Sequence, residues 1–451
     1  MSTRSDQADP RKTAESLEYL HGFGNLHSSE AVPGALPAGN STPHRPPLGL
    51  YTERFHGASM TEPRGNSRQA WMYRIRPSAQ HGPFSRIDGG TFRGLADAQT
   101  EMNRSSWNPQ PDPKPGTDFV SGLWTFGGHG DPAERTGMAV HVYAANASMK
   151  DTVFSNSDGE MLITPFEGAL LVRTEFGLLH VKPGDVALIP RGVRFRVELL
   201  DAMARGYVAE NFGRPLVLPE LGPLGSTALA DPKDFRAPVA AYEDVERPVQ
   251  AIVKYCGELW SSTYDHSPLD VVAWHGNHVP YVYDLHSFMT VGTLSHGHAD
   301  PSVYTVLTSP TDTPGVANFD FCSVVGRWEV AMDSFRPPYY HRNIGSEFVG
   351  IVKTPPFGPT MFGEPGAGML HNMLAPHGLW PEGDVATTNA AALEPEWIDI
   401  GLAIFYDSRL PLKLTRQALE SPQRQHDFDK HWQGFERRFP RSPLQEDINA
   451  R

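Results

Sequence analysis

Five histidines and one glutamate gather within one window of the second half of the sequence. They are His296, His298, His341, Glu347, His371 and His377. Two imidazoles and one carboxylate on one side of an Fe(II) ion leave coordination positions open for a substrate and for O2. Zinc would favour a closed tetrahedral set, often with thiolates, and neither Cys256 nor Cys322 is suitably spaced. The cluster therefore indicates non-heme iron chemistry.

The spacing of His341 and Glu347 tests whether the two side chains can share an ion. On a straight strand six residues would separate them by roughly 20 Å, because each residue adds about 3.3 Å. The chain must therefore turn, and Gly345 lies where a hairpin would need a glycine. We expect a returning strand to bring Glu347 beside His341, and His377 to come from another strand. The alternative is a surface carboxylate and structural histidines, because spacing alone is only a hypothesis.

Four more residues are candidates for contact with a substrate. Asn343 would share the face of His341 and could orient a ligand, and Tyr340 adjoins His341. His371 lies at even spacing from His377, so it could point into the same cavity or support it from outside. His296 shares a face with His298 on a regular strand.

The charge and cysteine content exclude several classes of protein. The 451 residues include 39 Lys and Arg against 52 Asp and Glu, a formal net charge of -13, which repels nucleic acid and anionic membrane surfaces. No apolar run approaches the roughly 18 residues that span a bilayer, and the polar N-terminus is unlike a signal peptide. Two cysteines fit a reducing compartment, so we expect a cytoplasmic protein without nucleic-acid or membrane partners.

Alternation of apolar residues predicts many short strands. Segment 137–143 alternates with strand periodicity, and further candidates lie at 161–165, 169–176, 186–190 and 194–199. After a Pro- and Gly-rich interval at 214–238, strand-like segments return between residues 271 and 353. Many short strands at this spacing indicate a sandwich or barrel, so the expected fold class is mostly β.

The domain organisation follows from composition and periodicity. Residues 1–16 lack apolar periodicity and are expected to form a flexible tail. We place a domain boundary near residue 286, which gives domains 17–286 and 287–451. Phe428, Trp432, Phe435 and Phe439 recur at spacings of three or four, so the C-terminal tail is expected to be a short helix.

The second half resembles the cupin pattern. Cupins place a His, a second His or Asn, and a Glu around one turn, with a further His on a later strand. His341, Asn343, Glu347 and His377 fill those places. Segments 184–185 and 189–195 resemble a faded copy of the second cupin motif, with Phe195 where a metal-binding His would stand. This resemblance implies two cupin or jelly-roll β-barrels, the first of them metal-free.

Longer segments resemble one family, the homogentisate 1,2-dioxygenases. They include YLHGFGN from Tyr19, DFVSGLWT from Asp118, FSNSDGEMLI from Phe154, LPELGPLG from Leu218, VVAWHGN from Val271, HADPSVYTVLT from His298 and FRPPYYHRN from Phe335. The resemblance implies an Fe(II) enzyme that opens the ring of homogentisate with O2, in tyrosine and phenylalanine breakdown. It also implies His341, Glu347 and His377 as iron ligands, His298 as the proton-handling residue, and a homo-oligomer, trimer or hexamer.

The sequence departs from the family pattern where the substrate would lie. Pro356 stands where family members carry a Tyr, Leu379 and Trp380 follow the last ligand in place of Pro and Asp, and Gly345 replaces a bulkier residue. Loss of a hydrogen-bonding Tyr can change substrate preference by orders of magnitude. Three hypotheses follow: homogentisate cleavage, the same chemistry on another hydroquinone or related aromatic, and a non-catalytic bicupin that binds a small molecule.

Overall fold

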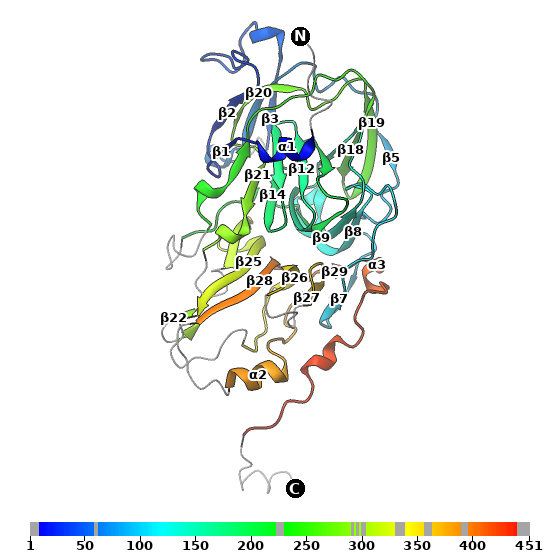
Figure 1. Cartoon of the computed structure of the whole chain (residues 1–451), viewed down its shortest axis with the longest axis vertical. Coiled ribbons are helices and arrows are strands. Elements are labelled where there is room, and N and C mark those ends of the chain that lie inside the picture. The colour runs from blue at the N-terminus through cyan, green and yellow to red at the C-terminus, as the bar shows by residue number, and fades with distance from the viewer. Residues whose placement is uncertain are drawn as a thin grey trace.

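Strands dominate the molecule, and its helices are short (Figure 1). The computed structural model describes residues 9–57, 62–221, 230–289, 304–329, 339–355, 363–388 and 396–439, with the backbone alone of 293–294, 297–298, 329, 387–388 and 396. Most of the first half of the chain forms the upper part of the molecule in Figure 1, and most of the second half forms the lower part. The predicted fold class, mostly β, is confirmed.

Eight strands of the first half form a jelly roll. Four neighbours in one sheet follow the order β9, β16, β11, β14, and four in another follow the order β10, β15, β12, β13. A chain that alternates between two sheets in this way has the double Greek key of a jelly roll. The strands are β9 (Thr136–Ala145), β10 (Thr152–Asn156), β11 (Glu160–Glu167), β12 (Leu170–Thr174), β13 (Gly177–Val181), β14 (Asp185–Ile189), β15 (Phe195–Leu199) and β16 (Ala204–Asn211).

Further strands extend both sheets and add a third. The first sheet has the order β1-β17-β21-β14-β11-β16-β9-β8-β29-β6, the second β13-β12-β15-β10-β18-β19-β5, and the third β2-β20-β4-β3. Their bounds are β1 (Tyr19–His21), β2 (His27–Glu30), β3 (Tyr51–His56), β4 (Gln69–Arg74), β5 (Ser85–Ile87), β6 (Gln99–Thr100), β8 (Leu123–Asp131), β17 (Arg236–Pro238), β18 (Val249–Tyr255), β19 (Glu258–Tyr264), β20 (Val271–Gly276), β21 (Tyr281–Asp284) and β29 (Lys413–Leu414). Short 3-10 helices are η1 (Pro47–Gly49), η2 (Arg64–Asn66), η3 (Pro132–Glu134), η5 (Pro232–Asp234) and η6 (Leu285–Ser287).

Aromatic side chains fill the interior of the jelly roll. Phe195 is fully buried, and its ring meets Phe154 edge-on at 5.6 Å and Phe119 at 6.1 Å between centroids. Edge-to-face contacts of this kind stabilise a core beyond the area they bury. The residue that stands in place of a cupin histidine is therefore part of the hydrophobic core.

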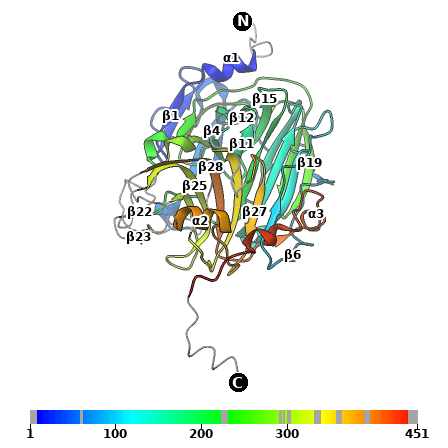
Figure 2. The same ribbon diagram turned by 60° about the horizontal axis from the view of Figure 1, so that its bottom comes forward.

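The second half is built on one six-stranded antiparallel sheet, in the order β24-β25-β28-β26-β27-β7. Figure 2 shows this sheet with α2 in front of it. The elements are β7 (Ser105–Trp107), β24 (Thr305–Pro310), β25 (Ala317–Glu329), β26 (Ser346–Lys353), β27 (Gly368–His371), β28 (Glu396–Ser408) and α2 (Pro381–Thr388). A separate two-stranded sheet pairs β22 (Thr293–Leu294) with β23 (Gly297–His298). Helix α2 was not predicted from the sequence.

The two halves share strands and a core. Strand β7, from the first half, adds an edge to the sheet of the second, while β29, from the second, pairs with β8 of the first. Phe348 packs against Phe126 at 4.9 Å between ring centroids, and the Tyr207 hydroxyl donates to the carbonyl of Ala367 at 2.7 Å. One face of the second sheet is therefore fixed on the jelly roll, and its other face is left for the site.

The prediction of a loose N-terminal tail was wrong for its last residues. Helix α1 (Pro10–Glu15) begins after Asp9, whose carboxylate accepts the backbone N–H of Arg11 at 3.0 Å. An Asp cap followed by Pro is a favoured helix start. Ala14 is buried against Leu171 of the jelly roll, so burial of one small apolar side chain holds the helix in place.

The predicted C-terminal helix is shorter than its apolar stripe. Helix α3 (Arg416–Leu419) and the 3-10 helix η8 (Phe428–Trp432) are present, but residues 433–439 are not helical. Gly434 has a φ of 89°, which ends the helix, and Phe439 is exposed. Phe428 and Trp432 pack in one apolar cluster, whereas Phe435 and Phe439 lie beyond the end of the helix. Among the described residues, no helix is long and apolar enough to cross a membrane.

Candidate metal centre

His341, Glu347 and His377 come together on the face of the second sheet that does not pack on the jelly roll. Each offers one ligand atom, and the three atoms lie within 4.8 Å of one another. The rings of His341 and His377 are 4.1 Å apart between centroids, and His377 Nε2 lies 3.9 Å from Glu347 Oε1. The three residues that the sequence predicted as ligands are neighbours in space.

A backbone bridge, rather than a hairpin, brings the two histidines together. The N–H of His341 donates to the carbonyl of His377 at 2.9 Å, and the reverse bond is 3.1 Å. The Leu374 N–H donates to the Asn343 carbonyl at 2.7 Å, which ties the same two loops again. The expected hairpin between His341 and Glu347 was wrong, because His341 pairs with the His377 loop while Glu347 lies in β26.

Gly345 has a different role from the one predicted. Its φ is outside the left-handed region, so the turn does not require glycine for its conformation. A Cβ at this position would lie 2.8 Å from the Ser408 carbonyl oxygen, which is closer than real contacts allow. The glycine permits the loop to approach β28, and the amide oxygen of Asn343 accepts the Gly345 N–H at 3.0 Å.

Both histidines direct one nitrogen to the backbone. His341 Nδ1 lies 2.9 Å from the Tyr339 carbonyl, and His377 Nδ1 lies 2.9 Å from the Ala375 carbonyl. A carbonyl only accepts, so each Nδ1 carries the proton and each Nε2 keeps a lone pair. His377 Nε2 is buried with no hydrogen-bond partner among the described residues. Imidazoles that bind metals are usually held in this way by a backbone carbonyl, so these residues fit a divalent metal.

His371 is a third imidazole of the centre. It pairs with Glu347 across β26 and β27, its Nδ1 lies 3.5 Å from Glu347 Oε1, and its ring stacks on His377 at 3.9 Å. The side chain is buried, and neither ring nitrogen has a hydrogen-bond partner in the described part of the chain. Because Nδ1 faces Glu347 and Nε2 has no partner among the described residues, His371 can contact a molecule bound there through Nε2.

A row of acidic residues continues from Glu347 across the sheet. Glu347 pairs with Asp407 on β28, and Asp407 pairs with Asp320 on β25. One carboxylate oxygen of each aspartate is buried without a hydrogen-bond partner in the regions described. Sequence analysis missed both aspartates, because strand alternation gives the face of a residue but not its neighbour on the next strand.

The surroundings set the charge of the site. Burial raises the pKa of Glu347, but its close contact with His371 and the other imidazoles outweighs burial, so the pKa is lowered. Burial and then the nearby His371 lower the pKa of His377 to about 4. Burial, followed by repulsion from Glu347 and Asp320, holds the pKa of Asp407 well above its usual range. At neutral pH an ionised Glu347 therefore faces a neutral His377, which are the forms that bind metals.

Aromatic residues form one wall of the site. Trp432 lies 6.4 Å from the ring of His371, its Nε1 donates to the Gly378 carbonyl at 3.1 Å, and the Arg104 guanidinium lies 4.0 Å above it. Trp380 stacks on His431 at 3.9 Å with nearly parallel planes. Trp432 of the C-terminal segment therefore lies beside His371 and Gly378, although that segment is far from them in sequence.

The other predicted residues lie in different places. Tyr340 is exposed and meets Phe435 edge-on at 5.5 Å, and Asn343 caps the turn before Gly345. Tyr339, which precedes Tyr340, is also exposed. His296 lies outside the described residues, and His298 is described only by its backbone in β23.

Comparison with known proteins identifies the family. The family model described as "Homogentisate 1,2-dioxygenase N-terminal" matches residues 18–285, and the one described as "Homogentisate 1,2-dioxygenase C-terminal" matches residues 286–439. The chain belongs to the homogentisate 1,2-dioxygenase family. The resemblance seen in the sequence motifs is thereby confirmed.

Solved structures give only weak likenesses to this family member. A salicylate 1,2-dioxygenase from Pseudoaminobacter salicylatoxidans, solved as adducts with gentisate, is 8% identical with a TM-score of 0.27, over 71% of this chain and 87% of that one. A cupin 2 conserved barrel domain protein from Leptotrichia buccalis is 8% identical with a TM-score of 0.25, over 60% and 83%. A putative glyoxylate-induced protein from Pseudomonas aeruginosa is 9% identical with a TM-score of 0.30, over 72% and 96%. Likenesses of this strength say nothing about substrate.

Two departures from the family pattern lie beside the site. Leu379 and Trp380, which follow the last predicted ligand, are half-buried, and Trp380 belongs to the aromatic wall. Pro356 lies outside the described residues, one position after the buried Pro355. In this family member an apolar wall therefore stands next to the ligand set.

Proposed function

We propose that this protein is an Fe(II)- and O2-dependent dioxygenase that cleaves the ring of a hydroquinone-type aromatic. The family supports homogentisate as the substrate and maleylacetoacetate as the product. His341, Glu347 and His377 would hold the iron. Two imidazoles and one carboxylate are the donor set of non-heme Fe(II) oxygenases, and they leave positions open for substrate and O2.

One observation carries the proposal. The Nδ1 atoms of His341 and His377 are both engaged by backbone carbonyls, which leaves both Nε2 atoms available beside the oxygens of Glu347. A buried nitrogen without a partner is costly in a protein interior, and His377 Nε2 is such an atom. A metal ion would remove that cost by accepting the lone pair.

When bound, the iron supplies the redox chemistry that activates O2. The chain supplies orientation and proton transfer. His371, between Glu347 and Trp432, can exchange a hydrogen bond with a substrate oxygen through Nε2, which has no partner in the described part of the chain. His298 would take and return a phenolic proton, as the family resemblance implies, because an imidazole titrates near neutral pH. The aromatic wall would exclude water from the reacting ring.

A second candidate is the same chemistry on another hydroquinone or a related aromatic. The observation that favours it is the apolar wall that contains Leu379 and Trp380, together with Pro356 in place of a Tyr. A site that lacks one hydrogen-bonding hydroxyl no longer selects for the substrate group that the hydroxyl would meet.

A third hypothesis, a non-catalytic small-molecule binder, does not explain the arrangement of the ligand atoms. A binding pocket needs no set of three convergent ligand atoms, and it needs no open imidazole such as His371 beside them.

The test is anaerobic loading of the full chain with Fe(II), followed by O2 uptake with homogentisate and with other substituted hydroquinones. We expect one iron per chain and O2 uptake with at least one of these compounds. Uptake with another hydroquinone but not with homogentisate would select the second candidate. Stoichiometric iron with no uptake on any compound would rule out ring cleavage and favour the binding protein.

A further inference from the structure

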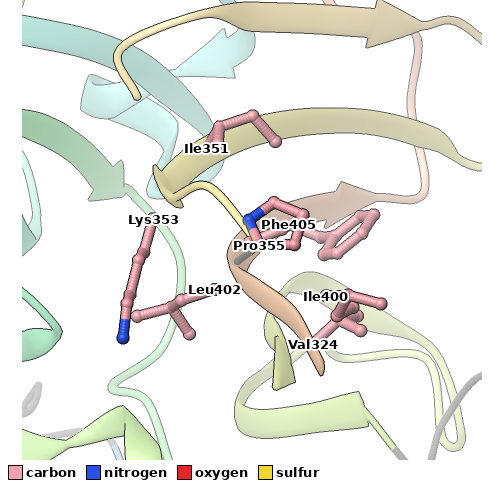
Figure 3. A pocket seen from close by; sticks show the side chains of 8 residues that line it. Val324, Ile351, Lys353, Pro355, Ile400, Leu402 and Phe405 are labelled. Atoms are coloured by element: carbon pink, nitrogen blue, oxygen red, sulfur yellow. The ribbon is translucent and has the colours of Figure 1, made fainter. Parts of the chain in front are cut away.

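Figure 3 shows a small apolar cavity on the second sheet, partly open to solvent. The strand register places its residues Ile351 and Ala403 on the same face as Glu347 of the metal centre. Its volume is about 50 Å³. The walls include Val324 of β25, Ile351 of β26, and Ile400, Ala403 and Phe405 of β28. Lys353 is the charged residue of the described lining; its side chain is exposed, and in Figure 3 it lies on the side opposite Ile400 and Phe405. The cavity therefore offers almost no hydrogen-bonding partner to a guest.

The size of the cavity limits what it can hold. An apolar cavity of about 150 Å³ stays dry and accepts benzene or xenon. A cavity of about 50 Å³ is too small for an aromatic ring but large enough for a diatomic molecule. Water would need two to four polar partners to be stable there, and the described lining does not provide them. The ligand class that fits is a small apolar gas.

The register of the sheet gives the position of the cavity relative to the metal centre. Glu347 pairs with Asp407, Val349 with Phe405, and Ile351 with Ala403, in three successive cross-strand pairs on one face. Val324 lies beside Ala403 in the third pair. Four residues along a strand correspond to about 13 Å, so the cavity lies two cross-strand pairs from the predicted ligand Glu347.

The intervening surface is apolar. Val349, Ile351, Met369, Ala403 and Phe428 form one buried cluster, with Phe405 and Trp432 packed against it. Phe405 lines the cavity, and at the other end Trp432 meets His371 at 6.4 Å. The described side chains between the cavity and His371 are therefore apolar, a medium that admits O2 more readily than it admits water or ions.

We propose that this cavity holds dioxygen and releases it toward the metal centre. The proposal rests on the function proposed above, because a ring-cleaving dioxygenase consumes one O2 in each turnover. Of the compounds in that reaction, O2 alone is both apolar and small enough for the cavity. The aromatic substrate would enter from the histidine side, where the open nitrogens lie.

Xenon is the probe of the cavity itself, because it binds where small apolar molecules bind. The full-length protein should show a saturable site in xenon-129 NMR. Val324→Phe places a ring in the cavity and should abolish that site. Val316→Phe makes the same change at an exposed position before β25 and should leave it intact. Ala403→Leu fills the cavity from β28 and replaces Val324→Phe if that variant does not fold.

Kinetics of the iron-loaded enzyme test the delivery of O2. Val324→Phe should raise the KM for O2 about fivefold or more, with kcat at saturating O2 and the KM for the aromatic unchanged, because impaired capture of O2 does not alter the chemical step. Absence of a xenon site in the wild-type protein overturns the proposal. So does an unchanged KM for O2 in a variant that has lost the xenon site. A xenon site in a protein that cleaves no aromatic would overturn the proposed function and leave the gas site standing.

Discussion

The two halves of the molecule each bury a cluster of His, Glu and Asp, and the two clusters differ in how their charges are satisfied. In the jelly roll, Glu210 lies 3.2 Å from His141 Nε2 and accepts hydrogen bonds from Lys254 and Asn156, both at 2.6 Å. Lys254 also lies 3.3 Å from Asp158. Each buried charge has an opposite charge beside it.

In the second half, the buried carboxylates of the cluster lack a Lys or Arg partner in the described part of the chain. Glu347 faces imidazoles that have open nitrogens, and Asp407 and Asp320 continue the row of carboxylates. Among the described residues, no Lys or Arg forms an ion pair with these three carboxylates. A buried cluster that already contains its cation is complete as a structural element, whereas a cluster with excess acceptors is suited to a metal ion. The same residue types therefore stabilise one half and form a site in the other.

The largest expected effect comes from removing the anionic ligand. Glu347→Ala should abolish both iron retention and turnover, since one of three ligands is lost. Iron content by metal analysis and O2 uptake measure this, with circular dichroism to show that the fold is kept. Glu364→Ala, an exposed carboxylate in the same half, is the control and should retain iron. Stoichiometric iron in the Glu347 variant would mean that the ligand set is assigned incorrectly.

Breaking the paired cluster should affect stability and not chemistry. Lys254→Met leaves Glu210 buried beside Asp158 without its ammonium partner, and loss of one member of a buried ion pair costs about 3 to 5 kcal/mol. Urea unfolding measures the change. Lys233→Met, in an exposed pair with Asp231, should change little. If the Lys254 variant were as stable as the wild type but lost iron, the contrast between the two clusters would not hold.

The pH dependence of stability should reveal the pairing of Glu210 with Lys254. Burial raises the pKa of Glu210, but Lys254 and His141 outweigh it and lower the pKa from 4.5 to about 2. A lowered pKa means that the stabilisation is present above pH 4.5 and is lost as the pH falls toward 2. The free energy of unfolding of the wild type should decline over that window. The decline should be smaller in Lys254→Met, because the lowered pKa depends on Lys254.

Replacement of Phe195 tests whether this position of the jelly roll serves the hydrophobic core and not a metal site. Phe195→Ala should cost about 3 to 5 kcal/mol because the ring is fully buried and its loss leaves a cavity. Iron content per chain and kcat should stay near wild type in chains that remain folded. Two tightly bound ions per wild-type chain would contradict the assignment of a single centre.

The smallest effect is expected from the proton-handling residue. His298→Gln should leave iron content near normal and lower turnover about 100-fold, a typical share for general acid-base catalysis. Steady-state O2 uptake with the substrate identified by the hydroquinone screen measures this. Turnover at the wild-type rate would exclude the proton-transfer role, and loss of iron would place His298 among the ligands.

The sequence by itself determined the elements and the chemical types. Strand alternation predicted β9, β11, β12, β14 and β15, because the period of two is a local property of the residues. Long motifs identified the family, and residue type together with spacing selected His341, Glu347 and His377.

Only the tertiary structure decided which side chains meet. The bridge between His341 and His377, the neighbours Asp407 and Asp320, and the contact of Trp432 with His371 all depend on register and on contacts between distant segments. The predicted hairpin failed for the same reason, since the Gly345 loop is shaped by the Ser408 carbonyl of another strand. Local sequence fixes the face on which a side chain lies, but its partner is chosen by the strand that packs beside it.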